Sequence, residues 1–385
     1  MAMFADSFYP TIDGAVISME TQARGLEARG HEVVMFAPDT PKRLKMDRPV
    51  HYFPSFAFRS YTDYRIVWAA PRMMECVRKE RVDVLHCHGL ASMAILSLTV
   101  ARALNIPHVL TFHTMANEAV KYYSFVPLRE DMMVPMVWIY LRNLLRRPEV
   151  VIAPSAPIRD ELIENRIKMK ACEVVPTGID IQRFTPKNHD PAFLERWGLD
   201  GNRVILHVGR LSFEKRLDIV LNAMADLRKE EPDLRLLVVG KGPASDHYQR
   251  LAESLGIKDR VVFTGFLPDD DLPKAYASCD MLVIASTFET QGLVVLEAMA
   301  SGTPVAGIRS RAIPEFVKEG KNGCLFDETS CTDAIRRCLS KANSMKMEAV
   351  AMAMGFSIDT CTAKLEKTYD LAAEIMKNDL ENRWF

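Results

Sequence analysis

Two carboxylates, Glu289 and Glu297, mark the stretch of the sequence with the clearest chemistry. Glu289 lies in a polar loop, and Glu297 lies in an otherwise apolar run from Leu293 to Ala300 that predicts a short helix. No cation stands four residues before or after Glu297, so its own helix offers no ion pair. Because a buried carboxylate without a partner is costly, we expect a group from outside the chain to bind Glu297. The alternative is that Glu297 lies on a solvated helix face.

The start of this predicted helix is a candidate anion site. The backbone N–H groups of Gly292, Leu293 and Val294 lack partners within the helix and point toward its N-terminal end. Gly292 also leaves room for a close approach to the backbone. An anion between two hydroxyl-binding carboxylates has the outline of a nucleotide-sugar, with the diphosphate in the centre, the ribose on one side and the hexose on the other.

Two cations follow another predicted strand, 204–208. Gly209 ends that strand, and Arg210 and Lys215 lie in the loop before the next helix. Such fixed cations stabilise the charge that develops on a leaving nucleoside diphosphate, and they do so without a metal. The alternative is that both are ordinary surface charges.

The N-terminal half contains a second candidate site. Gly14 ends the loop between a predicted strand at 3–5 and a helix at 16–29, which is another place for an anion. The loop is not G-x-G-x-x-G, so the fingerprint of a nicotinamide-dependent dehydrogenase is absent. His88 and His113 follow the predicted strands 82–86 and 108–112. A lone loop histidine more often makes a plain hydrogen bond, so these two depend on the wider pattern.

The elements that must position these residues alternate along the chain. Strands at 3–5, 32–37, 50–53, 82–86, 108–112, 150–153 and 173–176 are separated by helices at 16–29, 67–79, 90–104 and 158–167, and the same alternation restarts at 204. This pattern predicts parallel sheets covered on both faces, with ligands bound beyond the carboxyl ends of the strands. At 385 residues the chain is long enough for two such α/β domains.

The pair Glu289 and Glu297, within Phe-Glu-Thr-Gln-Gly-Leu-Val-Val-Leu-Glu-Ala-Met-Ala, resembles the E-x7-E signature of the GT4 family of retaining glycosyltransferases. The run from Gly209 to Lys215 is similar to the family's Gly-Arg-x4-Lys arrangement. The resemblance implies the GT-B fold, with two Rossmann-like parallel-sheet domains facing a deep interdomain cleft. It implies an acceptor-binding domain at 1–183, a nucleotide-sugar-binding domain at 184–363, and a C-terminal helix at about 364–385 that packs back on the first domain.

The resemblance also implies roles for individual residues. The catalytic residues would be His113, Arg210, Lys215 and Glu289. The donor-binding residues would be Gly14, Gly209, Gly265, Phe266, Gly292, Leu293, Val294 and Glu297, and the acceptor residues would be Tyr122 and Tyr123. The family often has two glycines near position 14, and this sequence has Ala15 at the second. Gly14 is therefore the residue expected to approach the donor phosphates.

The reaction that the resemblance implies is a retaining, metal-independent transfer of a hexose from a UDP- or GDP-hexose to an acceptor hydroxyl. Residues 112–114, 122–123 and 175–179 look most like the members that glycosylate diacylglycerol or related membrane lipids. Two alternatives stay open, a transferase for a soluble sugar acceptor and a GT-B nucleotide-sugar epimerase. The nucleotide-sugar is a substrate, and we expect no cofactor and no metal.

Composition limits the cellular setting. The eight cysteines are scattered without a C-x-x-C, which is typical of a reducing compartment. His86-Cys87-His88 lacks a second ligand cluster, and the acids at 269–271 are interpreted as the start of a helix. We expect a cytoplasmic protein without a leader or a membrane span, peripheral on the inner face of the membrane.

The net charge of −1 is uneven along the sequence. Residues 42–81 hold ten lysines and arginines against four acids, which is a candidate contact for an anionic membrane surface, although ordinary solvated helix faces are the default interpretation. Nucleic acid is not an expected partner, because the positive surplus is local and has no interleaved stacking motifs.

Overall fold

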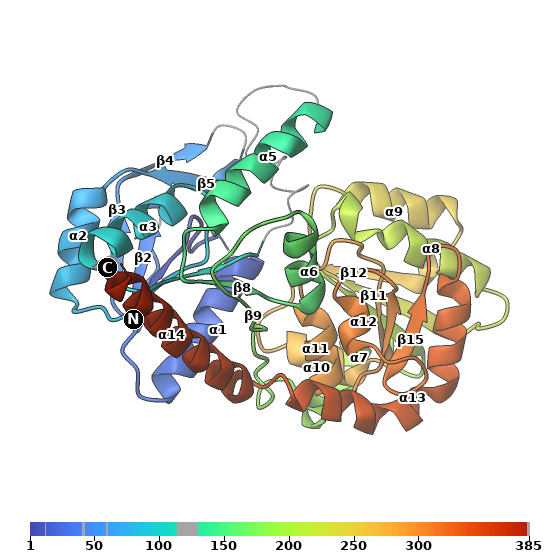
Figure 1. Ribbon diagram of the computed structural model, residues 1–385. Coiled ribbons are helices and arrows are strands. Elements are labelled where there is room, and N and C mark those ends of the chain that lie inside the picture. Colours follow the sequence, from blue (N-terminus) through green and yellow to red (C-terminus); the bar gives the residue numbers. More distant parts are fainter. Residues whose placement is uncertain (12, 41–42, 59–60, 114–129, 383–385) are drawn as a thin grey trace. The chain divides into compact units, whose positions relative to one another are not determined.

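The computed structural model describes the chain except for residues 12, 41–42, 59–60, 114–129 and 383–385. The described chain forms two compact units, residues 1–178 with 358–385 and residues 179–357 (Figure 1). The two ends of the second unit meet, since the Ile179 N–H donates to the Phe356 carbonyl at 2.8 Å. Residues 179–183 therefore group with the second unit, a few residues before the boundary that we expected from the sequence.

A seven-stranded parallel sheet forms the centre of the first unit. Its strand order is β3-β2-β1-β6-β7-β8-β9, and β4 and β5 form a separate antiparallel hairpin. The strands are β1 (Ala2–Phe4), β2 (Val34–Pro38), β3 (Val50–Phe53), β4 (Ser55–Phe58), β5 (Tyr61–Val67), β6 (Leu85–Cys87), β7 (His108–Thr111), β8 (Val150–Ala153) and β9 (Cys172–Val174). The helices are α1 (Gly14–Ala28), α2 (Ala70–Lys79), α3 (Ser92–Leu104), α5 (Glu130–Leu145), α6 (Ala156–Glu164) and α14 (Ile358–Glu381). The sequence order reverses between β1 and β6, so right-handed crossovers place α1 and α3 on opposite faces.

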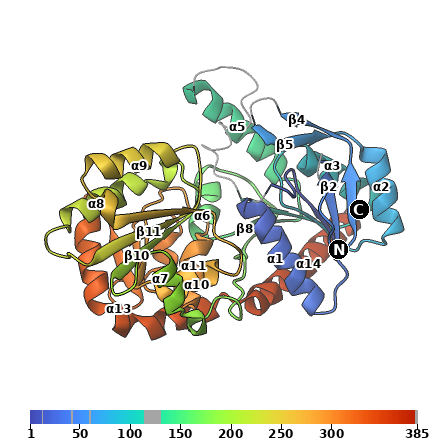
Figure 2. The same cartoon turned by 180° about the vertical axis from the view of Figure 1, so that it is seen from behind.

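The C-terminal helix α14 packs on α1 in the first unit (Figure 2). The contact is close at Gly25 of α1, where an added Cβ would lie 2.1 Å from Thr362 Oγ1. At one end of the contact, the Arg29 guanidinium donates to Asp359 at 2.7 Å and to Glu366 at 2.9 Å. A glycine and ion pairs from two distant parts of the sequence thus hold the last helix against the first.

One expected helix begins later than predicted. The sequence favoured a helix over 67–79, but Val67 ends strand β5, which pairs with β4 in the register Ser55 to Val67. The helix begins at Ala70, and Pro71 lies in its first turn, where a missing N–H costs nothing. The β4–β5 hairpin was not predicted.

The second unit contains a six-stranded parallel sheet in the order β12-β11-β10-β13-β14-β15. Its strands are β10 (Arg203–Val208), β11 (Leu234–Val239), β12 (Val261–Gly265), β13 (Met281–Ile284), β14 (Val305–Ile308) and β15 (Gly323–Phe326). Its helices are η1 (Pro186–Asn188), α7 (Pro191–Arg196), η2 (Phe213–Lys215), α8 (Leu217–Asp226), α9 (Ser245–Ser254), η3 (Lys258–Arg260), α10 (Leu272–Ser278), α11 (Leu293–Ala300), α12 (Ile313–Phe316) and α13 (Cys331–Met354). The order reverses between β10 and β13.

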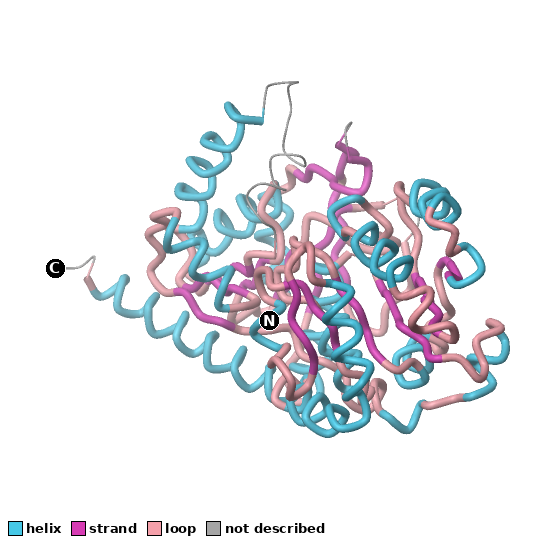
Figure 3. The backbone as a smooth tube through the Cα atoms, turned by 90° about the vertical axis from the view of Figure 1, so that its right-hand side faces the viewer, coloured by secondary structure: helices cyan, strands magenta, loops and turns pink. Residues whose placement is uncertain are grey.

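Apolar side chains cover this second sheet on both faces. The tube view shows the helices (cyan) packed around the strands (magenta) (Figure 3). One core contains Leu221 of α8, Tyr248 of α9 and Ile335 of α13, and the other contains Phe193 of α7, Tyr276 of α10 and residues of α11. The strands read as continuous apolar runs because both of their faces are buried.

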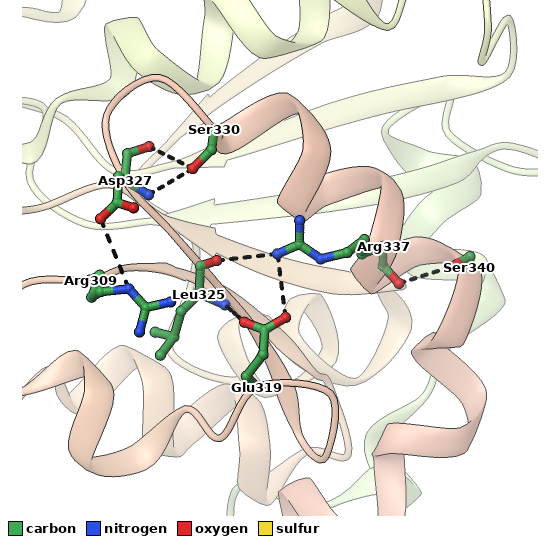
Figure 4. A network of polar contacts seen from close by, with 7 residues as sticks. All are labelled: Arg309, Glu319, Leu325, Asp327, Ser330, Arg337 and Ser340. Atoms are coloured by element: carbon green, nitrogen blue, oxygen red, sulfur yellow. Dashed lines mark hydrogen bonds and ion pairs between the residues drawn. The ribbon is translucent and has the colours of Figure 1, made fainter.

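Polar contacts hold the far edge of the second sheet (Figure 4). The Glu319 carboxylate accepts from the Leu325 N–H at 2.6 Å and from Arg337 of α13 at 3.3 Å. Arg309, after β14, lies 3.9 Å from Asp327, after β15. These contacts join β15 to α13 and the loop after β14 to the loop after β15.

We predict that Gly25→Ala destabilises the protein, although alanine is the better helix former by about 0.5–1 kcal/mol. The new Cβ would meet Thr362 Oγ1, and that hydroxyl is held because it donates to the Ile358 carbonyl at 2.7 Å. Overpacking of this kind costs about 1–3 kcal/mol, so the free energy of unfolding in urea should fall. Gly14→Ala is the matched control on the same helix, because its Cβ would meet nothing within 4 Å in the described part of the chain. Equal stability of Gly25→Ala and the wild-type protein would show that α14 does not pack as described.

Candidate active site

Two loops of the second unit meet at the carboxyl ends of β10 and β13, where the strand order reverses. This point is where parallel α/β sheets bind their ligands. The loop after β10 supplies Lys215, and the loop after β13 supplies Glu289. Their side chains form an ion pair, with Lys215 Nζ 2.7 Å from Glu289 Oε1. The structure thus brings together two residues that the sequence analysis selected from motifs 74 positions apart.

The surroundings of Glu289 keep it ionised. Its side chain is 14% exposed and that of Lys215 is 26% exposed, so water screens the pair only in part. Burial by itself would raise the pKa of Glu289, but the charge and hydrogen bond of Lys215 outweigh it, with smaller help from Ser286 and His207, and the pKa is lowered. A carboxylate that accepts hydrogen bonds therefore stands next to a cation at this point.

The helix α11 begins directly after this loop. Gly292 is its N-cap residue and has φ +81°, a conformation that side chains rarely adopt. An added Cβ there would also lie 3.1 Å from Ile313 Cδ1. The first amides of the helix, which include those of Leu293 and Val294, have no partners within the helix and carry its positive dipole end. This end of the helix attracts an anion.

Glu297 lies further along α11 and has a partner within the chain. The Tyr276 hydroxyl, from α10, donates to Glu297 Oε2 at 2.7 Å. The premise that Glu297 has no partner within the chain is therefore wrong for one of its oxygens. Burial raises the pKa of Glu297, and the hydrogen bond from Tyr276 offsets only part of that effect. Tyr276 was missed because it lies on another helix, where helical spacing gives no signal.

The remaining predicted residues of this unit lie in neighbouring loops. Gly209 has φ +154°, and an added Cβ at Gly240 would lie 2.0 Å from the Gly209 carbonyl, so the loops after β10 and β11 touch. Arg210 has an exposed side chain. Gly265 ends β12, and Phe266 after it is 75% exposed, with Lys241 Nζ 5.9 Å from the centre of its ring.

His207 was not singled out in the sequence, although it is the one histidine within the buried strand β10. Its Nδ1 lies 3.2 Å from the Val283 carbonyl, and its buried Nε2 has no partner among the described residues. Burial lowers its pKa to about 4, so the ring is neutral at neutral pH. The charge of Lys215 lowers this pKa further and that of Glu289 raises it.

The first unit has its own reversal point, between β1 and β6. Asp6, after β1, is buried and accepts from the N–H groups of Ala91 at 2.7 Å and Met93 at 2.9 Å, which ties the loop after β1 to the start of α3. Asp13 caps α1 by accepting from the Val16 N–H at 2.9 Å. Gly14 is the first residue of α1, and the space where its Cβ would be is open.

His113 follows β7 and contacts His88, which follows β6. His113 Nε2 lies 2.9 Å from His88 Nδ1, and the two rings are stacked with centroids 5.2 Å apart. Burial lowers the pKa of His113 to about 4 and that of His88 well below its usual range. Both rings are therefore neutral at neutral pH.

Three further expectations concern the acceptor tyrosines, a metal site and the acids at 269–271. Tyr122 and Tyr123 fall within 114–129, which the structure does not describe. The residues that it does describe contain no group of three histidines, cysteines or acids placed to hold a metal ion. In 269–271, Asp271 takes the N-cap position of α10 without a capping hydrogen bond, and its carboxylate accepts from Arg196 at 3.2 Å.

The basic region 42–81 is less charged in the fold than in the sequence. Arg48 is nearly buried and pairs with Glu20 at 2.7 Å and Glu27 at 2.8 Å, and Arg43 pairs with Asp39 at 2.6 Å. The other described lysines and arginines of 42–81 still outnumber the acids of this region. No helix in the described part of the chain has the length and apolar content needed to cross a membrane.

Comparisons with known proteins agree with this architecture. The family model described as "Glycosyltransferase Family 4" matches residues 12–183, and the one described as "Glycosyl transferases group 1" matches 191–350. The chain is 30% identical to an alpha-monoglucosyldiacylglycerol synthase of Streptococcus pneumoniae, over 97% of this chain and 82% of that protein. It is 32% identical to a GDP-mannose-dependent alpha-mannosyltransferase of Mycolicibacterium smegmatis, over 85% of this chain and 84% of that protein.

The fold is also found in solved structures. The crystal structure of Anabaena HepE in complex with UDP and glucose matches with a TM-score of 0.76 and 21% identity, over 96% of this chain and 99% of that one. The two family models and the 30% identity over nearly the full length together place the protein: it belongs to the GT4 family of retaining glycosyltransferases, has the GT-B fold and is a hexosyltransferase that uses a nucleotide-sugar.

Proposed function

We propose that the protein transfers a hexose from a UDP- or GDP-hexose to a hydroxyl of a membrane lipid such as diacylglycerol, without a metal or other cofactor. The observation that carries this proposal is the Lys215–Glu289 ion pair beside the start of α11. It combines a cation, a hydroxyl-binding carboxylate and a positive helix end at the reversal point of one sheet. These are the groups that a sugar diphosphate needs.

Each part of the donor would meet a matching group. Arg210, Lys215 and the amides of Gly292, Leu293 and Val294 would bind the diphosphate. Glu289 would accept from the hexose hydroxyls and Glu297 from the ribose. The Oε1 atom of Glu297 would accept from the ribose, since Tyr276 already donates to Oε2 of the same carboxylate. Gly209, Gly265 and Phe266 would line the path of the nucleoside. Gly14 and His113, from the first unit, would approach the diphosphate and the hexose.

The chemistry follows from these charges. The lysine ammonium has three donors, so Lys215 can keep its bond to Glu289 while it donates to a phosphate oxygen. As the bond between the anomeric carbon and the phosphate oxygen breaks, Arg210, Lys215 and the helix end stabilise the charge on the leaving diphosphate. The acceptor hydroxyl forms its bond to the same face of the anomeric carbon, and its proton passes to the departing phosphate oxygen. The configuration is retained.

The lipid acceptor is supported by the relatives. The proteins named alpha-monoglucosyldiacylglycerol synthase from Streptococcus pneumoniae and Acholeplasma laidlawii are 30% and 28% identical to this chain. The first unit would bind this acceptor, with Tyr122 and Tyr123 as candidate contacts. The unpaired part of the basic region 42–81 would approach anionic headgroups on the cytoplasmic face of the membrane.

We predict that the purified protein converts diacylglycerol in vesicles to an α-linked hexosyl lipid when it is given UDP-glucose or GDP-mannose. The product is measured by thin-layer chromatography with labelled donor, and its anomeric configuration by NMR. Incubation with donor alone is the control. Isomerised donor without acceptor would identify an epimerase, and transfer only to a soluble sugar would contradict the lipid acceptor.

Glu289→Gln should lower kcat at least about a hundredfold, because the amide keeps the shape but loses the charge that faces the hexose and Lys215. The measurement is a steady-state transfer assay, with circular dichroism to confirm folding. Glu253→Gln is the matched control, since that carboxylate is 50% exposed on α9 and pairs with Lys258. A Glu289→Gln enzyme with wild-type kcat would remove Glu289 from the mechanism.

Gly14→Ala should fold normally and yet bind the donor more weakly. Its Cβ meets no atom of the described residues within 4 Å, so we expect the methyl group to displace a bound ligand. We expect the KM for the donor to rise about tenfold, which corresponds to the loss of about 1.4 kcal/mol of binding. Unchanged donor kinetics in a normally folded variant would mean that the backbone at Gly14 does not approach the donor.

A further inference from the structure

The hydrogen bond between His88 and His113 limits which ring nitrogen of each histidine can carry the proton. It joins His88 Nδ1 and His113 Nε2 at 2.9 Å, so one of these two nitrogens carries the proton and the other accepts it. Both rings are held neutral by burial, so each carries a single proton. There are therefore two arrangements, and they differ in which nitrogen of His113 is protonated.

The second nitrogen of His88 decides between them. His88 is 4% exposed, and its buried Nε2 has no hydrogen-bond partner among the described residues. If His113 donated, His88 would have to carry its proton on Nε2, as a buried N–H without an acceptor. If His88 donates, Nε2 is only a bare lone pair. An orphaned buried N–H is the rarer and costlier state, so His88 Nδ1–H donates to His113 Nε2.

The neighbours of His88 fix its ring in this position. Its backbone N–H donates to the Phe4 carbonyl at 2.7 Å, and its ring lies 4.2 Å from the ring of His86, centre to centre. His86 is itself held, because Nδ1 lies 2.8 Å from the Tyr369 hydroxyl and Nε2 lies 2.7 Å from Thr111 Oγ1. Tyr369 belongs to α14, so the last helix of the chain takes part in ordering this group.

We propose that His88 is a positioning residue that holds His113 in its Nδ1–H tautomer, so that His113 presents a neutral N–H donor to a hydroxyl oxygen of the transferred hexose. The tautomer follows from the described contacts alone, and only the identity of the accepting oxygen rests on the proposed function. Among the described residues, nothing accepts a hydrogen bond from His113 Nδ1. With Nε2 already accepting from His88, His113 has no lone pair left with which to take the proton of the acceptor hydroxyl.

The tautomer is measured without any substrate. Two-bond ¹⁵N–¹H correlation spectra of the full-length protein, labelled at histidine, distinguish a protonated from a bare ring nitrogen, and His113→Gln assigns the signals of His113 by their loss. At pH 7 we expect His113 to show Nδ1 protonated and Nε2 bare. A protonated Nε2 in the wild-type protein would overturn the proposal.

Two variants of His88 test its role. His88→Asn places an amide N–H where Nδ1 was, so it should keep the His113 tautomer and most of the transfer rate. His88→Leu has a similar volume and no donor, so the Nδ1–H tautomer should no longer dominate and kcat should fall about tenfold, with little change in the donor KM. Thermal unfolding of both variants separates this effect from a loss of packing. An unchanged His113 tautomer in a folded His88→Leu protein would contradict the positioning role.

Failure of the proposed function gives a different result. If His113→Gln transfers hexose at the wild-type rate, His113 does not contact the sugar. The proposal that its Nδ1–H donates to a hexose hydroxyl is then wrong, even where the spectra show the expected tautomer. If His113→Gln is impaired while His88→Leu keeps the wild-type rate, the site assignment stands and the role of His88 is overturned.

Discussion

The ion pair between Lys215 and Glu289 is the constraint on which the candidate site depends. It exists because the strand order of the second sheet reverses between β10 and β13, which brings the loops after these two strands together. Partial burial makes each charge costly without the other, so the pair fixes both loops in one arrangement. The same arrangement holds the Glu289 carboxylate, a hydrogen-bond acceptor, next to the positive end of α11. A donor with a diphosphate and several hydroxyls can satisfy both charges at once.

The first unit uses the same topology with a different chemistry. Its sheet reverses between β1 and β6, but the group that joins the two loops is Asp6, a buried carboxylate bonded to backbone amides of the segment that enters α3. Next to it, histidines after or within neighbouring strands contact one another, and no charged group of the described residues contacts them. One unit therefore offers fixed charges, and the other offers neutral hydrogen-bonding groups. This division fits the proposal that the charged diphosphate meets the second unit and an uncharged hydroxyl of the hexose meets the histidines of the first.

Much of the fold was predictable because parallel strands buried on both faces read as short apolar runs between amphipathic helices. The predictions that were wrong concerned contacts between residues far apart in the sequence. Tyr276 donates to Glu297 from another helix, so the spacing within α11 left that carboxylate without a visible partner. Arg48 was counted as free positive charge in 42–81, yet its partners Glu20 and Glu27 lie before that window. The β4–β5 hairpin was missed, and Val67, the last residue of its second strand, was assigned to the helix that follows it. Two separate motifs indicated Lys215 and Glu289, and only the structure showed that their side chains are in contact.

A crystal structure of the protein with UDP or GDP tests the central claim most directly. The account predicts density for the diphosphate at the first amides of α11, with the Lys215 ammonium within hydrogen-bond distance of a phosphate oxygen and Glu289 still beside it. A nucleotide bound elsewhere on the second unit, with the start of α11 empty and the Lys215–Glu289 pair undisturbed, would contradict it.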